Sequence, residues 1–223
     1  MENRGAIEKR EGFVIFASPR SGSTSLADMI ASQGYSVCYE PFNPVLRGIY
    51  YDILKKEGVG TISQLMGEYD CVKHLSGHGG ELVDRTLLGY KSIILRRRNI
   101  LQAALSYCIS SRIGVWKARQ LVGGEYDSIG EIAIPHVYRA IGRIRHIEKY
   151  RADKVVYYED LYGENWEEQL RGIFDYFGIV MSDKDAIGYF MDIRHRMNSS
   201  ETYDKIKNIK EIEKLGCEEY GWL

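Results

Sequence analysis

Apolar residues occur along the chain either in short continuous runs, which predict strands, or at helical spacing, which predicts helices. Phe13–Ala17 is a continuous apolar run, which is typical of a strand buried on both faces of a parallel sheet. After a polar loop, Leu26, Met29 and Ile30 recur at helical spacing, and Gly34 is expected to end that helix. The first unit is therefore predicted to be a strand, a loop and a helix.

The chain continues this alternation to about residue 180. Further strands are expected at 35–39, 69–75, 90–95 and 154–158, and further helices at 46–57, after Asn99, at 130–150 and after Asn165. Asn99 with Gln102, and Asn165 with Glu168, have the spacing of helix-capping pairs. The predicted order is β-α-β-α-β-β-α-α-β-α. Such alternation predicts a three-layer α/β fold, with a central, mainly parallel β-sheet flanked by helices.

The periodic pattern fades from about residue 190 onward, where the sequence is polar and its apolar residues are irregularly spaced. We expect a C-terminal flap and a short terminal helix at 190–223. The length of 223 residues and the 44% of hydrophobic residues suit one globular domain over 1–223, with its core at 12–180.

The net charge, the apolar runs and the cysteine spacing indicate which partners, metal sites and cellular location to expect. A net charge of −1 gives no reason to expect a nucleic-acid partner. No apolar run approaches the ~20 residues of a transmembrane segment, and the N-terminal stretch MENRGAIEKREG lacks the apolar part of a signal peptide. Cys38, Cys71, Cys108 and Cys217 lie far apart and are not spaced as zinc ligands. These features predict reduced, mostly buried thiols, no metal site and a cytoplasmic location.

The loop at 18–24, with the sequence SPRSGST, joins the first strand to the first helix. Backbone N–H groups at a helix N-terminus attract anions. The loop fits the frame of a Walker P-loop with Gly22 and Thr24 in place, but Ser23 stands where the lysine should be and Arg20 supplies a cation instead. That lysine reaches the β- and γ-phosphates of a triphosphate. The loop therefore suits a 5′-phosphate that carries one further group. The alternative is an ordinary serine-rich helix cap.

Arginines follow the strand at 90–95. Arg96, Arg97 and Arg98 stand at its carboxyl end, and Ser106 lies eight residues after Arg98 on the next helix. An arginine and a serine in this arrangement could grip one phosphate from two sides. The alternative is a solvated basic patch.

Two more candidates follow the second and third strands. Glu40, in YEPF, could act as general base on a hydroxyl group, and His74, next to Lys73, is a candidate base or charge stabiliser. A turn glutamate and a structural histidine are the alternatives. Because the carboxyl ends of parallel strands meet at the ligand-binding edge of a sheet, the convergence of all these residues favours an active site.

These motifs resemble those of sulfotransferases. SPRSGSTSL resembles their 5′-phosphosulfate loop, in the form found in carbohydrate and bacterial members, and RNILQAALS resembles their 3′-phosphate motif. VVYYEDL resembles the strand and turn before the family's late helix. The resemblance covers residues 12–180 in motif order and implies a P-loop-like fold. It also implies 3′-phosphoadenosine 5′-phosphosulfate (PAPS) as sulfuryl donor, adenosine 3′,5′-bisphosphate (PAP) as product, and no metal.

The resemblance also implies roles for single residues. The 5′-phosphosulfate side of the donor site would comprise Ser18, Pro19, Arg20, Ser21, Gly22, Ser23 and Thr24. Arg98 and Ser106 would hold the 3′-phosphate, with the register open across the three arginines, and Tyr158 would lie near the adenine. Glu40 matches the glutamate base of carbohydrate-type members. We prefer it to His74, because Lys73-His74-Leu75 departs from the K-x-H-L setting of the cytosolic branch.

The chain departs from the cytosolic branch at its C-terminal end, where it lacks the basic R-K-G-x-x-G element. Ser199, Ser200, Tyr203 and Lys205 are the polar residues that could take its place. The expected acceptor is a hydroxyl of a carbohydrate, glycolipid or small molecule, bound between 39–52, 112–130 and the C-terminal flap. A P-loop-type small-molecule kinase and a non-catalytic nucleotide-binding protein are the alternative functions.

Overall fold

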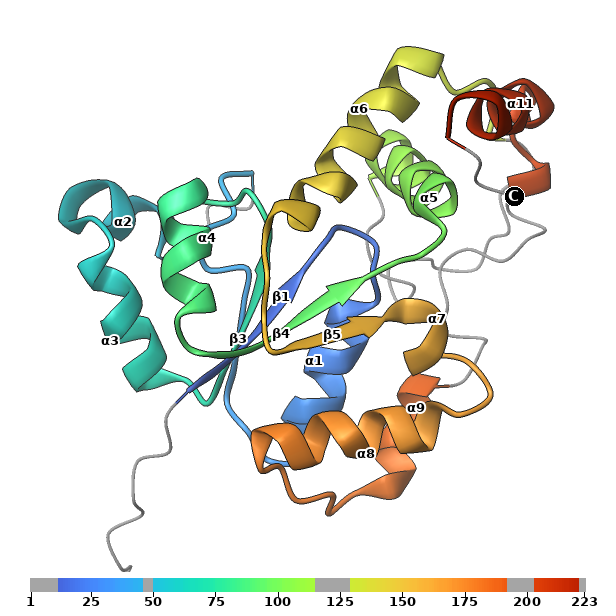
Figure 1. Ribbon diagram of the computed structural model, residues 1–223. Helices are drawn as coiled ribbons and strands as arrows, with labels where there is room; N and C mark the ends of the chain where they lie inside the picture. The colour runs from blue at the N-terminus through green and yellow to red at the C-terminus, as the bar shows by residue number, and fades with distance from the viewer. Residues whose placement is uncertain (1–11, 46–49, 115–128, 192–202, 221–223) are drawn as a thin grey trace, which may run out of the picture.

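A computed structural model describes residues 12–45, 50–114, 129–191 and 203–220. It contains one sheet of five parallel strands in the spatial order β2-β3-β1-β4-β5. The strands are β1 (Phe13–Ala17), β2 (Val37–Tyr39), β3 (Cys71–Leu75), β4 (Lys91–Arg96) and β5 (Lys154–Tyr157). Helices cover both faces of the sheet (Figure 1), so the predicted three-layer α/β fold is confirmed.

The helices connect these strands and extend beyond them. They are α1 (Ser23–Ser32), α2 (Tyr51–Glu57), α3 (Gly60–Glu68), α4 (Glu81–Leu88), α5 (Ile100–Ile113), α6 (Ile134–Arg145), the 3₁₀ helix η2 (His146–Lys149), α7 (Tyr158–Leu161), α8 (Trp166–Phe177), α9 (Lys184–Met191) and α11 (Ile209–Tyr220).

The central strand β1 shows why the first apolar run is continuous. It pairs with β3 on one side and β4 on the other, and all five of its residues are buried. Its odd-numbered residues join a core with α1 and α8, including Leu26 and Phe174, and its even-numbered residues join a core with α3 and α4. Burying one side chain of this size contributes about 1.5–3 kcal/mol. The strand therefore anchors both faces, and the loop that follows it starts from a fixed point.

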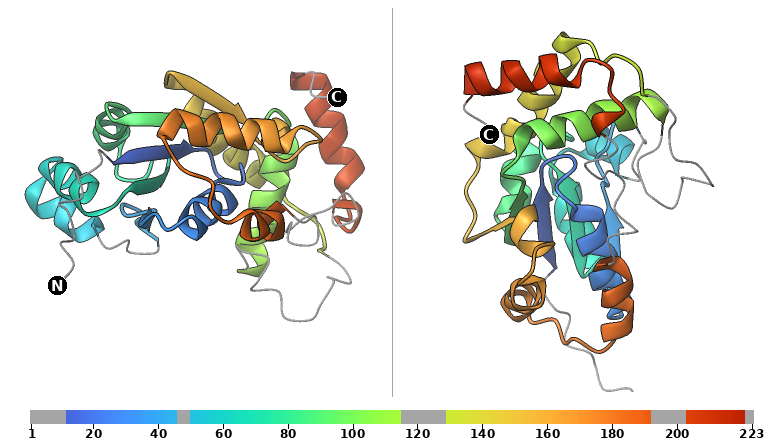
Figure 2. Two further views of the ribbon diagram at one scale, coloured as in Figure 1. Left: turned by 90° about the horizontal axis from the view of Figure 1, so that it is seen from below. Right: turned by 90° about the vertical axis from the view of Figure 1, so that its right-hand side faces the viewer.

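A third core lies beyond the carboxyl ends of the strands. It is built by α5, α6 and α11, which gather at one end of the molecule (Figures 1 and 2). Tyr203, Ile206 and Ile212 contribute buried side chains to this core, at 7%, 1% and 1% exposure. Ile206 also pairs with Gly130 in a short parallel bridge. The described part of the C-terminal segment is thus packed into the molecule next to the carboxyl edge of the sheet.

The predicted element order was incomplete, since it lacks α3, α4, α7 and α9. No helix was predicted between β3 and β4, but α4 lies there, because two parallel strands need a crossover connection. The hydrophobic pattern of α4 does not indicate an amphipathic helix, because Leu82 is 63% exposed while Asp84 is fully buried. The helix α3 was also not predicted. The helix predicted at 46–57 corresponds to α2, which begins at Tyr51. Residues 46–49 lie outside the described ranges.

The two predicted capping pairs differ in outcome. Asn99 accepts a hydrogen bond from the backbone N–H of Gln102 at 2.8 Å, as predicted. Asn165 occupies the N-cap position of α8 but makes no side-chain capping hydrogen bond, so the capping box with Glu168 is wrong.

The described cysteines match the prediction of buried thiols. Cys38, Cys71 and Cys108 are free and buried. Burial raises the pKa of Cys38 and of Cys108 to about 11, which keeps both thiols protonated at neutral pH. Within the described ranges, no helix is both long and apolar enough to cross a membrane.

Candidate active site

The loop after β1 closes on itself before α1 begins. Ser18 donates its backbone N–H to the carbonyl of Leu95 at 3.2 Å, and the hydroxyl of Ser21 donates to the carbonyl of Ser18 at 2.8 Å. Gly22 is the N-cap residue of α1 in a left-handed conformation, with φ of 80°. The first turn of α1 contains no acidic residue. No carboxylate of the first turn therefore neutralises the positive end of the helix dipole. This leaves the helix N-terminus able to attract an anion.

The remaining loop residues lie along the same turn. Pro19 and Thr24 are half-buried, and Ser23 is buried as the first residue of α1. The hydroxyl of Ser18 is buried without a hydrogen-bond partner in the described parts of the chain. Buried hydroxyls are usually hydrogen-bonded, and none of the described residues supplies a partner for this one.

Two tyrosines, Tyr158 at the start of α7 and Tyr162 just after its end, pack against the loop. The hydroxyl of Tyr162 donates to the carbonyl of Gly22 at 2.8 Å. A Cβ atom at Gly22 would lie 2.6 Å from the ring of Tyr162 and 2.9 Å from the ring of Tyr158. Only glycine fits there, both for its conformation and for space. Tyr158, which we expected near the adenine, thus lies directly against the loop at 18–24. We name this loop the phosphate loop, after its expected ligand.

Arg20 joins the loop to α5. Its Nε donates to the hydroxyl of Ser106 at 2.9 Å, across 86 positions of sequence. Arg97, at the end of β4, donates to the carbonyl of Arg20 at 3.4 Å, and its guanidinium lies 4.3 Å from the centre of the Tyr158 ring. Burial lowers the pKa of Arg20, and the like charge of Arg97 acts in the same direction. Two guanidinium groups held this close favour an anion beside them.

The C-terminal segment reaches the same place. The hydroxyl of Tyr203 donates to the carbonyl of Gln102 at 3.4 Å, and the side chain of Gln102 accepts a hydrogen bond from Arg97. Burial raises the pKa of Tyr203, while Arg97 and Arg20 act in the opposite direction. We call Arg20, Arg97, Ser106, Tyr158 and Tyr203 the arginine cluster. Lys205, named with Tyr203 in the sequence analysis, accepts at its carbonyl from Ile129, and Ser199 and Ser200 lie outside the described ranges.

The other two arginines of the triplet have different partners. Arg98 makes two hydrogen bonds to the carboxylate of Asp160, at 2.5 and 2.6 Å, and its side chain is 51% exposed. Arg96 donates to the carbonyls of Ile147 and Tyr150 at 3.2 and 3.0 Å. The structure thus brings Ser106 to Arg20, with Arg97 beside that pair, and brings Arg98 to Asp160.

Glu40 lies at the same edge of the sheet, just beyond β2. Its left-handed conformation, with φ of 47°, turns the chain, and its N–H donates to the carbonyl of Lys73 at 2.7 Å. One carboxylate oxygen binds the ammonium of Lys73, and the other accepts from Asn43 at 2.6 Å. Burial alone would raise the pKa of Glu40, but Lys73 and Asn43 outweigh it, so the pKa lies below its usual value. Glu40 is ionised at neutral pH.

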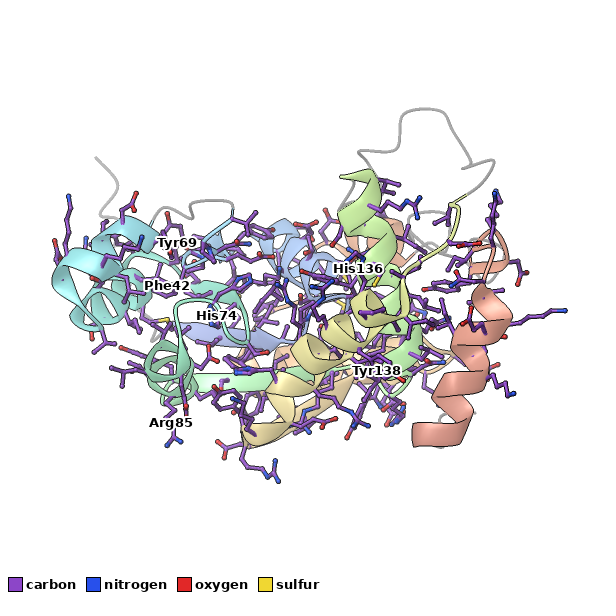
Figure 3. All side chains as sticks on the ribbon, turned by 90° about the horizontal axis from the view of Figure 1, so that it is seen from above. Phe42, Tyr69, His74, Arg85, His136 and Tyr138 are labelled. Carbon is purple, nitrogen blue, oxygen red and sulfur yellow. The ribbon has the colours of Figure 1, made fainter. Side chains whose placement is uncertain are left out.

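His74 belongs to the core beneath this edge. Its side chain is fully buried, and its Nε2 lies 2.8 Å from the carboxylate of Asp84. The ring packs beside Phe42, as Figure 3 shows, with the ring centres 6.0 Å apart. The other oxygen of Asp84 accepts from the backbone N–H of Gly77 and from the hydroxyl of Tyr150, both at 2.8 Å. His74 is thus tied into a buried network.

Lys73, Arg97 and His78 are site residues that the sequence analysis did not assign. Lys73 was noted only as a neighbour of His74, and Arg97 only as an alternative register. His78 places its Nδ1 3.9 Å from a carboxylate oxygen of Glu40. Its signal in the sequence is the run SGHGG, in which glycines enclose a single histidine just after a buried strand. Within the described residues, no group of three or more His, Cys, Asp or Glu side chains could hold a metal ion.

Comparisons with known proteins bear on the fold. No protein-family model and no curated protein matches the sequence. The structure is similar to mouse sulfotransferase SULT7A1 complexed with PAP, with a TM-score of 0.50 and 15% sequence identity over 89% of this chain and 71% of the mouse chain. The sulfotransferase domain of the Synechococcus PCC 7002 olefin synthase aligns with a TM-score of 0.40 and 15% identity, over 100% of this chain and 92% of that domain. The likeness to the mouse enzyme confirms the predicted fold class.

Proposed function

We propose that this protein transfers a sulfuryl group from PAPS to a hydroxyl group. The observation that carries the proposal is the P-loop-like turn without its lysine, whose Arg20 is hydrogen-bonded to Ser106 of α5 at 2.9 Å. A triphosphate site would need the lysine. A phosphosulfate instead suits a turn with one partly buried arginine at a helix N-terminus. The fold shared with a mouse sulfotransferase that binds PAP supports this choice.

In this proposal, residues 18–24 and the N-terminus of α1 hold the 5′-phosphosulfate, and Ser106 contacts the 3′-phosphate. Tyr158 offers an aromatic face to the adenine. Arg98 is the arginine that the sequence motif assigns to the 3′-phosphate, and it would have to leave Asp160 to reach it. Arg97 already lies beside Arg20. A 3′-phosphate is what separates PAPS from ATP, so this second anion contact is central to the proposal.

The chemistry requires stabilisation of the leaving group. As the sulfur–oxygen bond to the phosphate breaks, negative charge develops on the bridging oxygen. Arg20 and the backbone N–H groups of the loop would stabilise that charge, as preorganised donors do in other transfer reactions. Magnesium has no role in this proposal, because the reacting end of the donor carries one phosphate and one sulfate instead of a triphosphate.

The acceptor side of the site is the group formed by Glu40, Lys73 and His78. It lies at the same edge as the phosphate loop, because β3 pairs with β1 and Ser76 donates its N–H to the carbonyl of Ala17 at 3.0 Å. A carboxylate, an ammonium and an imidazole can together bind a hydroxyl and accept its proton. We propose a carbohydrate, a glycolipid or a small alcohol as the acceptor, in keeping with the carbohydrate-type form of the loop.

An acceptor screen tests the proposed function. The full-length protein would be incubated with ³⁵S-labelled PAPS and a panel of methyl glycosides, glycolipids, phenols and primary alcohols. The proposal expects label on at least one acceptor and an equal amount of PAP. Formation of a labelled product only with ³²P-labelled ATP and magnesium would support a kinase instead, and binding of PAP without any transfer would support a non-catalytic nucleotide-binding protein.

A further inference from the structure

The turn after β3 carries a histidine toward Glu40. His78 Nδ1 lies 3.9 Å from a carboxylate oxygen of Glu40, and 23% of the side chain remains exposed. No hydrogen bond of Nδ1 to any described residue is present. A partly exposed imidazole that has a carboxylate near one nitrogen can act as a general base once the carboxylate moves into hydrogen-bond distance as its orienting partner.

The other two candidate bases, Glu40 and His74, already interact with other residues. Both oxygens of Glu40 already have cationic or N–H partners in Lys73 and Asn43, which stabilise its ionised form and weaken it as a base. His74 is fully buried, and its Nε2 is directed to Asp84. Its ring therefore has no route to a hydroxyl at the surface of the site.

The structure fixes the turn on both sides of His78. On one side, Gly77 donates its N–H to the buried carboxylate of Asp84 at 2.8 Å. On the other side, a Cβ atom at Gly79 would lie 3.1–3.2 Å from atoms of Val83, Leu54 and Phe42, so this glycine is packed closely into the core. Gly77, Gly79 and Gly80 all have positive φ angles, at 88°, 83° and 94°, which other residues adopt only with strain. The position of His78 is thus built into the backbone.

We propose that His78 takes the proton from the acceptor hydroxyl, with Glu40 orienting the ring from behind its Nδ1. The proposal rests on the proposed sulfotransferase function. In the step, the acceptor oxygen forms a bond to sulfur while the bond from sulfur to the phosphate oxygen breaks. The electron pair of that bond leaves with PAP, and the hydroxyl proton goes to Nε2 of His78. The protonated ring then carries the positive charge, and the carboxylate of Glu40 offsets it.

Burial and the nearby charges keep the ring of His78 neutral. Burial lowers the pKa of His78 to about 4; Glu40 and Asp84 act to raise it, and His74 and Lys73 act to lower it further. His146 lies on the far side of the same turn, near Gly77. The ring is therefore neutral at neutral pH and has a lone pair for a proton. At a pKa this low it is a weak base, so the carboxylate of Glu40 is needed to stabilise its protonated form.

The test uses the acceptor with the highest rate in the screen above. His78→Gln and His78→Ala should lower kcat by about 10²-fold or more, the usual contribution of a general base, while the affinity for PAP stays within about threefold. Added imidazole should restore part of the kcat of His78→Ala, because the ring lies at the surface of the turn. His136→Gln is the matched control, since His136 is an exposed histidine on α6 (Figure 3), and its rate should equal that of the wild type.

Two outcomes would overturn the proposal. One is a kcat of His78→Gln within about threefold of the wild type, which would return the role of base to Glu40. The other is a loss in His78→Ala that imidazole leaves unchanged, which would mean that His78 only holds the turn in place. Failure of the proposed function is a separate result, because the wild type itself would then transfer no label to any acceptor.

Discussion

Two residues of the phosphate loop adopt left-handed backbone conformations, and only one of them is glycine. Gly22 has φ of 80° and Arg20 has φ of 63°. A left-handed conformation at a residue with a side chain costs about 1 kcal/mol or more and persists where the surroundings require it. At Arg20 the conformation directs a cation toward Ser106 of another element. The strain thus coincides with the residue to which we assign the main role in donor binding.

The glycine in this loop leads to a stability prediction. Gly22→Ala should lower the free energy of unfolding by about 1–3 kcal/mol, because the new Cβ atom would meet the rings of Tyr162 and Tyr158 in a disfavoured conformation. Gly142→Ala is the control, since Gly142 is exposed in α6 and its Cβ atom would meet open space. That change should be neutral or stabilise by up to about 1 kcal/mol. Urea unfolding of both variants measures the difference, and equal effects would contradict the packing described here.

The arginine triplet leads to a binding prediction. Arg97→Ala should lower the affinity for PAP by about 10–10²-fold and leave the affinity for 5′-AMP, which lacks the 3′-phosphate, within about threefold. Arg98→Ala should change both affinities little, because its guanidinium is paired with Asp160 at the surface. Isothermal titration of the two variants with PAP and with 5′-AMP measures these effects. The reverse result would mean that Arg98 leaves Asp160 when the donor binds.

The sequence alone predicts a phosphate-binding loop but not the partners of its residues. The loop could be recognised because its chemistry lies within seven consecutive positions. The contact between Arg20 and Ser106 spans 86 positions, so it depends on the packing of α5. The choice among Arg96, Arg97 and Arg98 depends on which side each side chain takes at the end of β4. The role of His78 depends on the buried Asp84, which no local pattern connects to it.

The side chain of Gln33 links the segment before α9 to the end of α1 by hydrogen bonds, beside the apolar packing of Ile187. The amide oxygen of Gln33, at the end of α1, accepts from the N–H groups of Ser182 and Asp183 at 2.6 and 2.8 Å, and its NH₂ group donates to the carbonyl of Asp183 at 3.0 Å. These contacts tie the start of α9 to α1 across about 150 positions of sequence.

Replacing this side chain tests the tie between the two helices. Gln33→Ala should lower the free energy of unfolding by about 1–2 kcal/mol, because four hydrogen bonds between a buried amide and Ser182 or Asp183 are lost together. Gln64→Ala is the control, since Gln64 is exposed and bonds only to Glu68 one turn away, and the change should stay within about 0.5 kcal/mol. Thermal or urea unfolding measures both, and a loss at Gln64 as large as at Gln33 would contradict the role of Gln33.

Some helices and strands can be predicted from the sequence more easily than others. The strand β1 is predicted well, because burial on both faces leaves five apolar residues in succession. The helix α4 is not, because it exposes Leu82 and buries Asp84, the reverse of the usual pattern. That reversal has a reason in the site, since Asp84 binds His74, Gly77 and Tyr150. The element that the pattern missed is thus one that supports the acceptor side.

At the scale of the whole molecule, the candidate site joins parts of all three cores. The phosphate loop starts from β1, between the two sheet-face cores, and Ser106 and Tyr203 come from the third core. A donor bound at the arginine cluster would contact β1, β4, α5 and the C-terminal segment together. Such a ligand stabilises the folded state by mass action, about 2.7 kcal/mol at a concentration one hundred times its Kd.

The central claim is that this edge of the sheet binds a nucleotide with a 3′-phosphate and a 5′-phosphate. Isothermal titration of the full-length protein with PAP, and separately with ATP and magnesium, tests it most directly. We expect PAP to bind at one site, at least about tenfold more tightly than ATP with magnesium, the margin that one additional charged hydrogen-bond contact supplies. We also expect EDTA to leave the affinity for PAP unchanged. Tighter binding of ATP with magnesium, or no binding of PAP, would contradict the account.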